Sequence, residues 1–255
     1  MDKSNMKEIL SVNNEQVKEV VKLHQKKYRN STGLFLMEGY KPVFEAFSFG
    51  VEIEKAFVTP KYFEKYSFLK EKLFVTTDAV MEKISTTETS PEIVAVGKQR
   101  KNTIDEIKSF SRIALIEDIK DAGNLGTIIR SAVAFGIECL VLCGDVIDLY
   151  NPKVVRSAVG ALYKIPIVCS DLQATRKAFP SHNFIATVVN HDDIVKPETI
   201  NYTKPFVLMM GSEANGLSAE AISFSDVKTT IPMSKDTESL NLGVASSILF
   251  YVSMV

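Results

Sequence analysis

Apolar residues in the second half of the chain fall into short continuous runs separated by longer periodic segments. The runs predict six strands, at residues 113–116, 139–143, 165–169, 184–187, 206–210 and 227–231. Apolar positions at helical spacing predict five helices, at residues 125–135, 152–162, 172–179, 219–224 and 240–251. Strands that are apolar throughout and alternate with helices are typical of a parallel sheet covered on both faces.

The first hundred residues show a shorter alternation. An amphipathic helix is predicted over residues 5–29. It is followed by strands at 33–39, 51–58, 73–76 and 92–97 and helices at 42–49, 60–68 and 79–84. Residues 98–111 are polar and only weakly periodic. We therefore predict a compact α/β domain at 1–100, a linker at 101–111 and a second α/β domain at 112–255.

Composition argues against a membrane-spanning protein, a secreted protein and a cysteine-bound metal. No apolar run approaches the roughly 20 residues of a membrane span, and the first residues lack the apolar core of a secretory signal. The three cysteines, Cys139, Cys143 and Cys169, are typical of reduced thiols in a cytosolic protein. Cys139 and Cys143 have no second cysteine pair or nearby histidine, so we expect no metal site.

The charge of the chain does not by itself indicate whether it binds nucleic acid. The formal net charge is −1, which argues against a strongly basic surface. Two local basic clusters occur at residues 22–29 and 98–101. The default interpretation is a solvated helix face and a solvated linker, and the alternative is a pair of contacts to phosphates.

Three loops in the second half are candidates for a site, because parallel α/β sheets bind ligands beyond the carboxyl ends of their strands. The first loop leads to Asn124, which we predict to cap a helix, and to Arg130 within that helix. Arg130 lies in an apolar run, so a buried guanidinium would need a partner. An internal carboxylate and a substrate phosphate both remain open as that partner.

The other two loops follow later strands. In the second, Glu213 stands directly after an apolar strand, and Ser218 is expected to cap the next helix. In the third, Ser239 is expected to cap the last helix, with Asn241 in its first turn. Each loop alone also fits an ordinary turn, or for Asn241 a second capping residue.

Taken together and in order, the three loops resemble the motifs of the SpoU/TrmH methyltransferases. The matching residues are Asn124, Gly126 and Arg130, then Gly211, Glu213, Gly216 and Leu217, then Ile231, Pro232, Met233, Ser239, Leu240 and Asn241. A fourth similarity is the segment from Arg156 to Ala161. Residues 35–39 with Glu45 and Ala46 resemble the RNA substrate-binding domain often fused to this enzyme. The chain has Ala122 where the family often has proline.

The resemblance implies a fold, a reaction and a site. The fold is a small N-terminal α/β RNA-binding domain followed by an α/β knot with a parallel sheet. The reaction is transfer of a methyl group from S-adenosylmethionine to a ribose 2'-hydroxyl in RNA, with rRNA favoured over tRNA. The implied catalytic residues are Arg130, Asn124, Glu213, Ser239 and Asn241. The implied cofactor contacts are Gly211, Leu217, Ile231, Met233 and Leu240.

The family also implies a homodimer and a cytoplasmic location. The last helix would supply the dimer surface through Val244, Ile248, Leu249 and Val252, although core packing explains the same residues. Because a guanidinium stays protonated, Arg130 is expected to anchor phosphate and stabilise charge rather than act as a base. The alternatives are a non-catalytic RNA-binding protein, a base methyltransferase, a tRNA ribose methyltransferase and a small-molecule-binding α/β protein.

Overall fold

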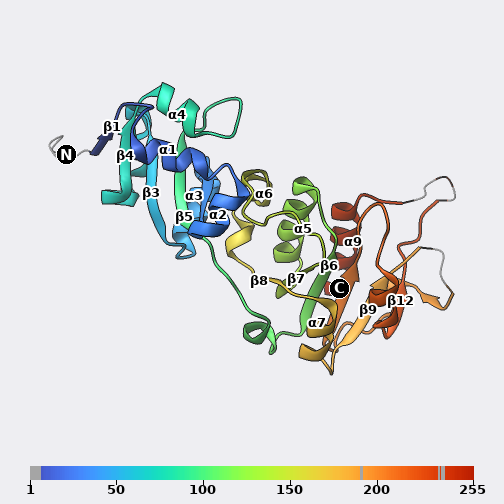
Figure 1. Ribbon diagram of the computed structural model, residues 1–255. Coiled ribbons are helices and arrows are strands. Elements are labelled where there is room, and N and C mark those ends of the chain that lie inside the picture. Colours follow the sequence, from blue (N-terminus) through green and yellow to red (C-terminus); the bar gives the residue numbers. More distant parts are fainter. Residues whose placement is uncertain (1–6, 190–191, 235, 237–238) are drawn as a thin grey trace. The chain divides into compact units, whose positions relative to one another are not determined.

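The computed structural model describes residues 7–189, 192–234, 236 and 239–255, and these form two compact units. The first unit comprises the chain up to Arg100 together with Asp148–Tyr163. The second comprises Lys101–Ile147 and Lys164–Val255. The ribbon in Figure 1 colours these segments along the sequence.

The second unit is built on a sheet of seven strands, all parallel, in the order β10-β12-β9-β11-β6-β7-β8. The strands are β6 (Arg112–Glu117), β7 (Cys139–Cys143), β8 (Ile167–Cys169), β9 (Asn183–Thr187), β10 (Ile194–Val195), β11 (Phe206–Met210) and β12 (Val227–Thr229). The central strands β6 and β11 are buried almost throughout, as the apolar runs predict. The predicted parallel sheet is therefore confirmed, and β10 is a strand that the pattern missed.

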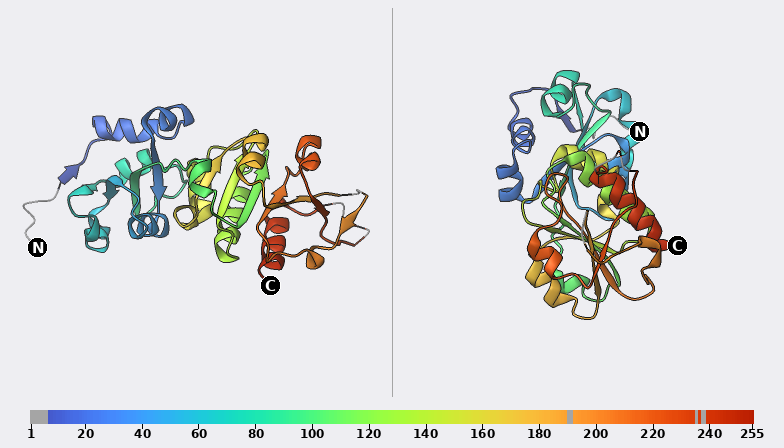
Figure 2. Two further views of the ribbon diagram at one scale, coloured as in Figure 1. Left: turned by 90° about the horizontal axis from the view of Figure 1, so that it is seen from below. Right: turned by 90° about the vertical axis from the view of Figure 1, so that its right-hand side faces the viewer.

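Helices cover both faces of this sheet. Helices α5 (Ala122–Ala134) and α9 (Leu242–Met254) pack side by side, as Figures 1 and 2 show. A core cluster on this sheet also contains residues of α7 (Leu172–Ala178), α8 (Ala219–Ser223) and the 3-10 helix η4 (Ile104–Ile107). Burying apolar side chains on both faces is what fixes a sheet of this kind.

Three polar residues cap the helices that begin near the carboxyl ends of the strands. Ser218 caps α8, as predicted, by accepting the backbone N–H of Ala221. The other two predictions were wrong by two or three residues: α5 is capped by Asp121 rather than Asn124, and α9 by Asn241 rather than Ser239. Asp and Asn both cap well, so candidates this close in sequence are separated only by the backbone path.

The first unit contains a sheet of five strands in the order β1-β4-β3-β5-β2. Its strands are β1 (Lys7–Ile9), β2 (Leu34–Glu38), β3 (Ile53–Val58), β4 (Leu73–Thr76) and β5 (Ile93–Lys98). Its helices are α1 (Glu15–Lys22), α2 (Lys26–Thr32), α3 (Tyr40–Ser48), α4 (Asp78–Ile84) and α6 (Pro152–Ala158), with 3-10 helices η2 (Pro60–Tyr62), η3 (Glu64–Lys72) and η5 (Ala161–Tyr163).

The predicted helix over residues 5–29 is wrong, because that segment forms one strand and two helices. β1 pairs in parallel with β4, and Asn14 starts α1 by accepting the backbone N–H of Gln16. The helix ends at Lys22, and α2 starts again at Lys26. The prediction over residues 60–68 also changes, since this stretch is 3-10 helix rather than α-helix.

Segment 148–163 is held in the first unit by two ion pairs. Arg29 is only 2% exposed and donates from Nε to Oδ2 of Asp148 at 2.8 Å. Its Nη1 also donates to the backbone oxygens of Leu23 and His24. Arg156 pairs with the buried carboxylate of Glu38. Arg29 is therefore not free to contact phosphate, which corrects the alternative interpretation of the 22–29 cluster for this residue.

The polar segment 101–111 carries the 3-10 helix η4, which has a capping box between Thr103 and Glu106. Ile107 of η4 is fully buried in the core of the second unit, with Ile104 and Phe110 packed beside it. Among the described residues, no helix is long and apolar enough to cross a membrane.

Candidate active site

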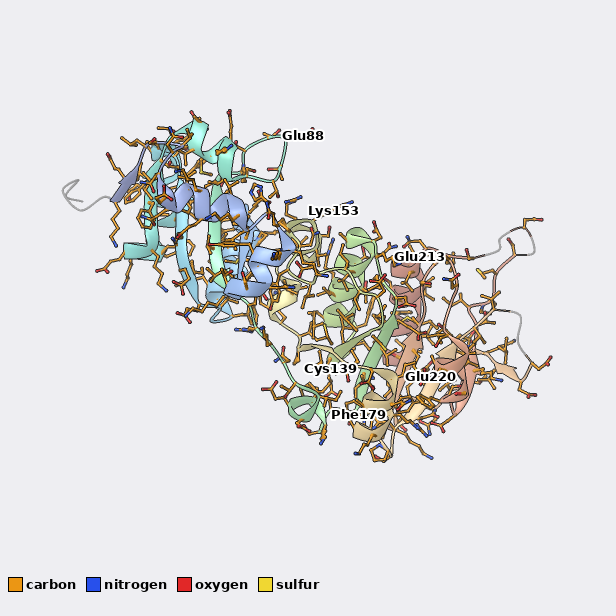
Figure 3. All side chains as sticks on the ribbon, viewed as in Figure 1. Glu88, Cys139, Lys153, Phe179, Glu213 and Glu220 are labelled. Atoms are coloured by element: carbon orange, nitrogen blue, oxygen red, sulfur yellow. The ribbon has the colours of Figure 1, made fainter. Side chains whose placement is uncertain are left out.

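Three side chains from distant parts of the sequence meet beyond the carboxyl ends of β6 and β11. Asn124, near the start of α5, donates from Nδ2 to the carboxylate of Glu213. Asn241 donates from Nδ2 to Oδ1 of Asn124 at 2.8 Å. Figure 3 shows Glu213 toward the carboxyl ends of the strands and Cys139, at the start of β7, toward their amino ends. The chain of hydrogen bonds Asn241–Asn124–Glu213 thus joins the three predicted loops.

Helix starts position two members of this chain. The backbone N–H of Asn124 donates to Oδ1 of Asp121 at 2.8 Å, so the cap of α5 fixes Asn124. Asn241 caps α9 through Oδ1, which leaves its Nδ2 free to reach Asn124. A Cβ added at Gly243 would lie 3.1 Å from the Cβ of Thr127, so this glycine lets α9 approach α5 closely.

Loop 211–218 is a tight turn that presents Glu213. A Cβ added at Gly211 would lie 2.0 Å from the backbone carbonyl of Gly216, so no larger residue fits there without moving the loop. The backbone N–H of Gly216 donates to the backbone oxygen of Ser212 at 2.9 Å. Gly216 itself has a φ of +65°, which glycine adopts without strain.

Glu117 holds the far end of this loop, and sequence reasoning missed it. It ends β6 and is buried, and it accepts from both the backbone N–H and the hydroxyl of Ser218, at 2.7 and 2.8 Å. Both carboxylate oxygens therefore have donors, as a buried charge requires. Its place at the end of a strand that the pattern predicts was the available signal.

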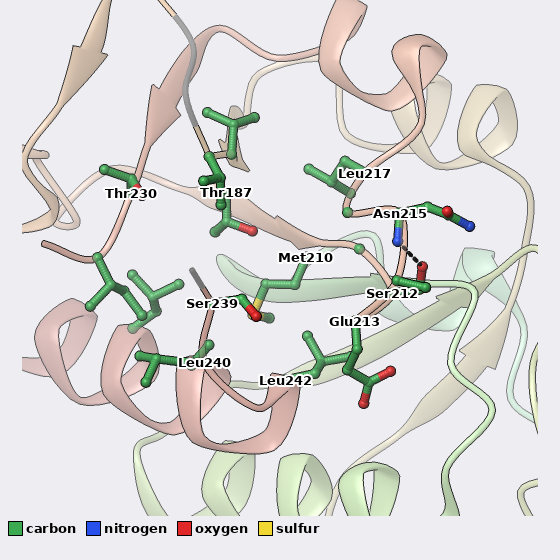
Figure 4. A pocket seen from close by; sticks show the side chains of 18 of the residues that line it. Thr187, Met210, Ser212, Glu213, Asn215, Leu217, Thr230, Ser239, Leu240 and Leu242 are labelled. Atoms are coloured by element: carbon green, nitrogen blue, oxygen red, sulfur yellow. Dashed lines mark hydrogen bonds between the residues drawn. The ribbon is translucent and has the colours of Figure 1, made fainter. Parts of the chain in front are cut away.

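A cavity of about 580 Å³ opens beside the loop, within the range of small-molecule sites. It is lined by all five residues that the resemblance implies for the cofactor, Gly211, Leu217, Ile231, Met233 and Leu240. Glu213 and Ser239 also line it. Figure 4 shows Met210, Leu217, Leu240 and Leu242 among the side chains around this space. The cavity therefore combines apolar walls with a polar rim.

One wall of the cavity was not anticipated. Thr187, Val188 and Val189 follow β9 and line it, and the hydroxyl of Thr187 donates to the backbone oxygen of Met209 at 3.0 Å. Because β9 neighbours β11 in a parallel sheet, its carboxyl end lies at the same edge. The strand order, which the sequence pattern does not contain, is what brings this segment in.

Arg130 stands apart from the hydrogen-bonded chain. Its side chain is exposed, which corrects the premise that it lies buried in α5. Within the described part of the chain, its guanidinium makes no hydrogen bond or ion pair, and it does not line the cavity. The buried face of α5 is formed instead by residues such as Leu125, Ile128 and Ile129.

Cys139 and Cys143 are buried in the core, whereas Cys169 is exposed. Burial raises the pKa of Cys139 to about 12 and that of Cys143 to about 11. Both thiols are therefore protonated near neutral pH, which is the unreactive form of cysteine. Among the described residues, no group of three or more His, Cys, Asp or Glu side chains is placed to hold a metal ion.

A parallel sheet whose loop tips surround one cavity defines an α/β protein that binds a small molecule at the carboxyl edge of its strands. Comparison with known proteins specifies it further. The SpoU rRNA methylase family matches residues 111–251, and the MRM3-like substrate binding domain matches residues 14–95. The chain belongs to the SpoU rRNA methylase family.

Relatives match nearly the whole chain. The 23S rRNA (guanosine(2553)-2'-O)-methyltransferase RlmP of Bacillus subtilis is 30% identical over 248 residues, which is 96% of this chain and 98% of RlmP. The crystal structure of an AdoMet-bound rRNA methyltransferase from Sinorhizobium meliloti has a TM-score of 0.89 at 28% identity and covers 98% of both chains. The AdoMet complex of AviRb from Streptomyces viridochromogenes has a TM-score of 0.83 at 25% identity and covers 95% of this chain and 97% of AviRb.

Several predictions made from the sequence are thereby confirmed. The fold class is α/β, with an N-terminal unit and a C-terminal unit of the SpoU fold. The enzyme class is that of an RNA methyltransferase, and the cofactor is S-adenosylmethionine. The roles of the individual site residues stay predictions.

Proposed function

We propose that this chain transfers a methyl group from S-adenosylmethionine to a ribose 2'-hydroxyl of ribosomal RNA. The observation that carries the proposal is the meeting of Asn124, Glu213 and Asn241 beside a cavity lined by the five predicted cofactor residues. Ribosomal RNA is favoured over tRNA because RlmP, which matches along nearly its whole length, is named for a 23S rRNA nucleotide.

The residues around the cavity fit the cofactor. A Cβ at Gly216 would have no atom within 4 Å, so polar groups of the ligand can approach the backbone there directly, and Gly211 lets the loop close against Gly216. Leu217, Met233 and Leu240 offer apolar walls to its rings and carbon chain. When bound, S-adenosylmethionine supplies an activated methyl group on its sulfonium. The loops hold this group in one orientation, which is where much of the rate enhancement arises in a displacement reaction.

The polar chain at the rim would hold the ribose. Asn124 is fixed by Asp121, Glu213 and Asn241, so it presents a preorganised edge to a hydroxyl. Ser239 lines the cavity nearby and can donate or accept. Arg130, exposed and positively charged, would anchor the RNA phosphate and stabilise the developing alkoxide, with the proton leaving to a phosphate oxygen or water.

We also propose a homodimer that works in the cytoplasm. Along α9, Val244, Ile248, Tyr251 and Met254 are 47%, 37%, 50% and 50% exposed. Such a continuous apolar face favours a second copy as its partner. Leu249 does not belong to this surface, because it is 1% exposed and packs in the core, which corrects that part of the prediction.

Calorimetric titration of the purified protein with S-adenosylmethionine tests the proposal. We expect saturable binding by the wild type and at least about tenfold weaker binding by Gly211→Ala, since the added methyl group collides with the carbonyl of Gly216. Absence of binding by the wild type would favour a non-catalytic RNA-binding protein. Methyl transfer to an RNA whose target nucleotide is 2'-deoxy would instead favour a base methyltransferase.

A further inference from the structure

Helix α3 carries a row of exposed aromatic rings in the first unit. Tyr40, Phe44 and Phe47 are spaced by four and three residues, so they lie on one face of the helix. Their side chains are 41%, 41% and 47% exposed. Aromatic side chains bury more apolar area than most others, so leaving three of them open to solvent calls for a ligand or partner.

The rings form a continuous band, called here the α3 aromatic row (Tyr40, Phe44, Phe47 and Phe68). Tyr40 and Phe44 are stacked, with centroids 5.3 Å apart and planes inclined by 16°. Phe68 from η3 lies 6.1 Å from Phe44 and 4.9 Å from Phe47, centroid to centroid. These contacts fix the rings relative to one another, so little side-chain freedom is left to lose on binding.

Positive charge lies at the Tyr40 end of the row. The Nζ of Lys65 lies 4.9 Å from the centroid of Tyr40 and 5.6 Å from that of Tyr66. The Nζ of Lys61 lies 5.0 Å from the centroid of Tyr62. Lys65 also pairs with Glu92 at the surface, an interaction of small energy that a phosphate can replace.

This chemistry differs from that of the apolar face of α9. There the exposed side chains are mainly aliphatic, Val244, Ile248 and Met254, which suits a second protein surface. Flat rings flanked by lysines are instead the combination that binds single-stranded nucleic acid, since every base has a face that stacks and every nucleotide carries a phosphate. The composition of the row and its charge therefore favour RNA over a second copy of the chain.

We propose that the α3 aromatic row stacks unpaired bases of the substrate RNA, with Lys61 and Lys65 contacting the adjoining phosphates. The inference rests on the proposed function, because it takes the substrate to be RNA. It adds that the first unit recognises a single-stranded stretch, a loop or a bulge, rather than a regular duplex. Duplex bases are stacked on one another and offer no free face to a ring.

The test uses the full-length protein and an unstructured RNA oligonucleotide that carries 2-aminopurine, whose fluorescence is quenched on stacking. The double variant Phe44→Leu/Phe47→Leu keeps apolar surface but loses the rings. We expect it to bind at least about tenfold more weakly and to lose the quenching. The matched control Phe44→Tyr/Phe47→Tyr keeps the rings and should bind within about twofold of the wild type. Unchanged far-ultraviolet circular dichroism and thermal unfolding of the variants verify folding of both units, which affinity for S-adenosylmethionine alone does not, because that cavity lies in the second unit.

Several results would overturn the inference. One is equal affinity of the leucine variant and the wild type for the oligonucleotide; another is loss of binding by the tyrosine control. A change of oligomeric state in the leucine variant at unchanged RNA affinity would make the row a self-association surface. Failure of the proposed function is distinct, because it would appear as a wild type that transfers no methyl group while stacking is still measurable.

Discussion

Asn124 shows how one residue can be determined by its surroundings. Its backbone N–H is used by Asp121, its side-chain nitrogen by Glu213 and its side-chain oxygen by Asn241. An amide with all these groups engaged cannot rotate without losing hydrogen bonds, each worth about 1 kcal/mol. Arg130 has no such restraint among the described residues, so its side chain is available to contact a substrate.

Substitution of Arg130 tests that role. We expect Arg130→Ala to lower the rate of methyl transfer by at least about 100-fold, because it removes the charge that would stabilise the developing alkoxide. The free energy of unfolding should change by less than about 0.5 kcal/mol, since the side chain is exposed. Single-turnover rates and thermal unfolding measure both.

Arg130→Lys is the matched control for this variant. It keeps the charge but loses the bidentate fork, so an intermediate rate is expected. Full activity of Arg130→Ala would remove Arg130 from the mechanism.

The raised thiol pKa values lead to a prediction about pH. Burial raises the pKa of Cys139 to about 12 and that of Cys143 to about 11, whereas the pKa of an unfolded thiol is about 8.5. A folded-state pKa above the unfolded value contributes stability below the unfolded pKa. That contribution is lost as the pH rises from about 9 toward 11 and 12.

A thiol reagent at pH 8 should therefore modify only the exposed Cys169 rapidly, and the other two after unfolding. Denaturant titrations of the wild type between pH 8 and 11 should show falling stability. A shallower fall is expected in Cys139→Ala/Cys143→Ala. Rapid labelling of all three cysteines in the native protein would contradict this picture.

At the scale of elements, Asn241 at the start of α9 has two roles: it caps the helix, and it donates a hydrogen bond to Asn124 in the candidate site. Asn241→Asp separates the two roles, because aspartate caps a helix as well as asparagine does. It cannot donate to Asn124, and any flip of the Asn124 amide turns an oxygen toward Glu213. We expect thermal stability within about 0.5 kcal/mol of the wild type, and methyl transfer about 10- to 100-fold slower.

The control for this prediction is Asn241→Ala, which loses the cap as well and should cost about 1 kcal/mol of stability. If Asn241→Asp transferred methyl groups at the wild-type rate, the hydrogen-bonded chain would have no part in the reaction.

Elements with long apolar runs were predictable, and their ends were not. β7 and β11 match the apolar runs residue for residue, because every residue of these strands is buried and therefore apolar. The caps of α5 and α9 were predicted at the wrong residues. Asp121 and Asn124 can both cap a helix, as can Ser239 and Asn241, and only the backbone conformation determines which one does. The cavity wall at Thr187 needed the strand order, a long-range property that periodicity does not contain.

At the scale of the whole molecule, the exposed face of α9 predicts self-association. Ile248 is 37% exposed in the middle of that face, so Ile248→Asp would bury a charge in any dimer formed there. We expect a dimer of the wild type and a monomer of the variant in sedimentation velocity. The matched control is Val195→Asp in β10, where a side chain of similar exposure, 38%, lies outside α9. Dimers of all three proteins would place the dimer surface elsewhere, and a monomeric wild type would contradict the proposed dimer.

The most direct test of the account is a single assay of the reaction. Purified protein is incubated with S-adenosylmethionine carrying a trideuterated methyl group and with ribosomal RNA from cells that lack this protein, and the nucleosides are analysed by mass spectrometry. The account predicts one deuterated 2'-O-methylnucleoside, with the label on the ribose. Label on a base, or no label in the RNA, would contradict it.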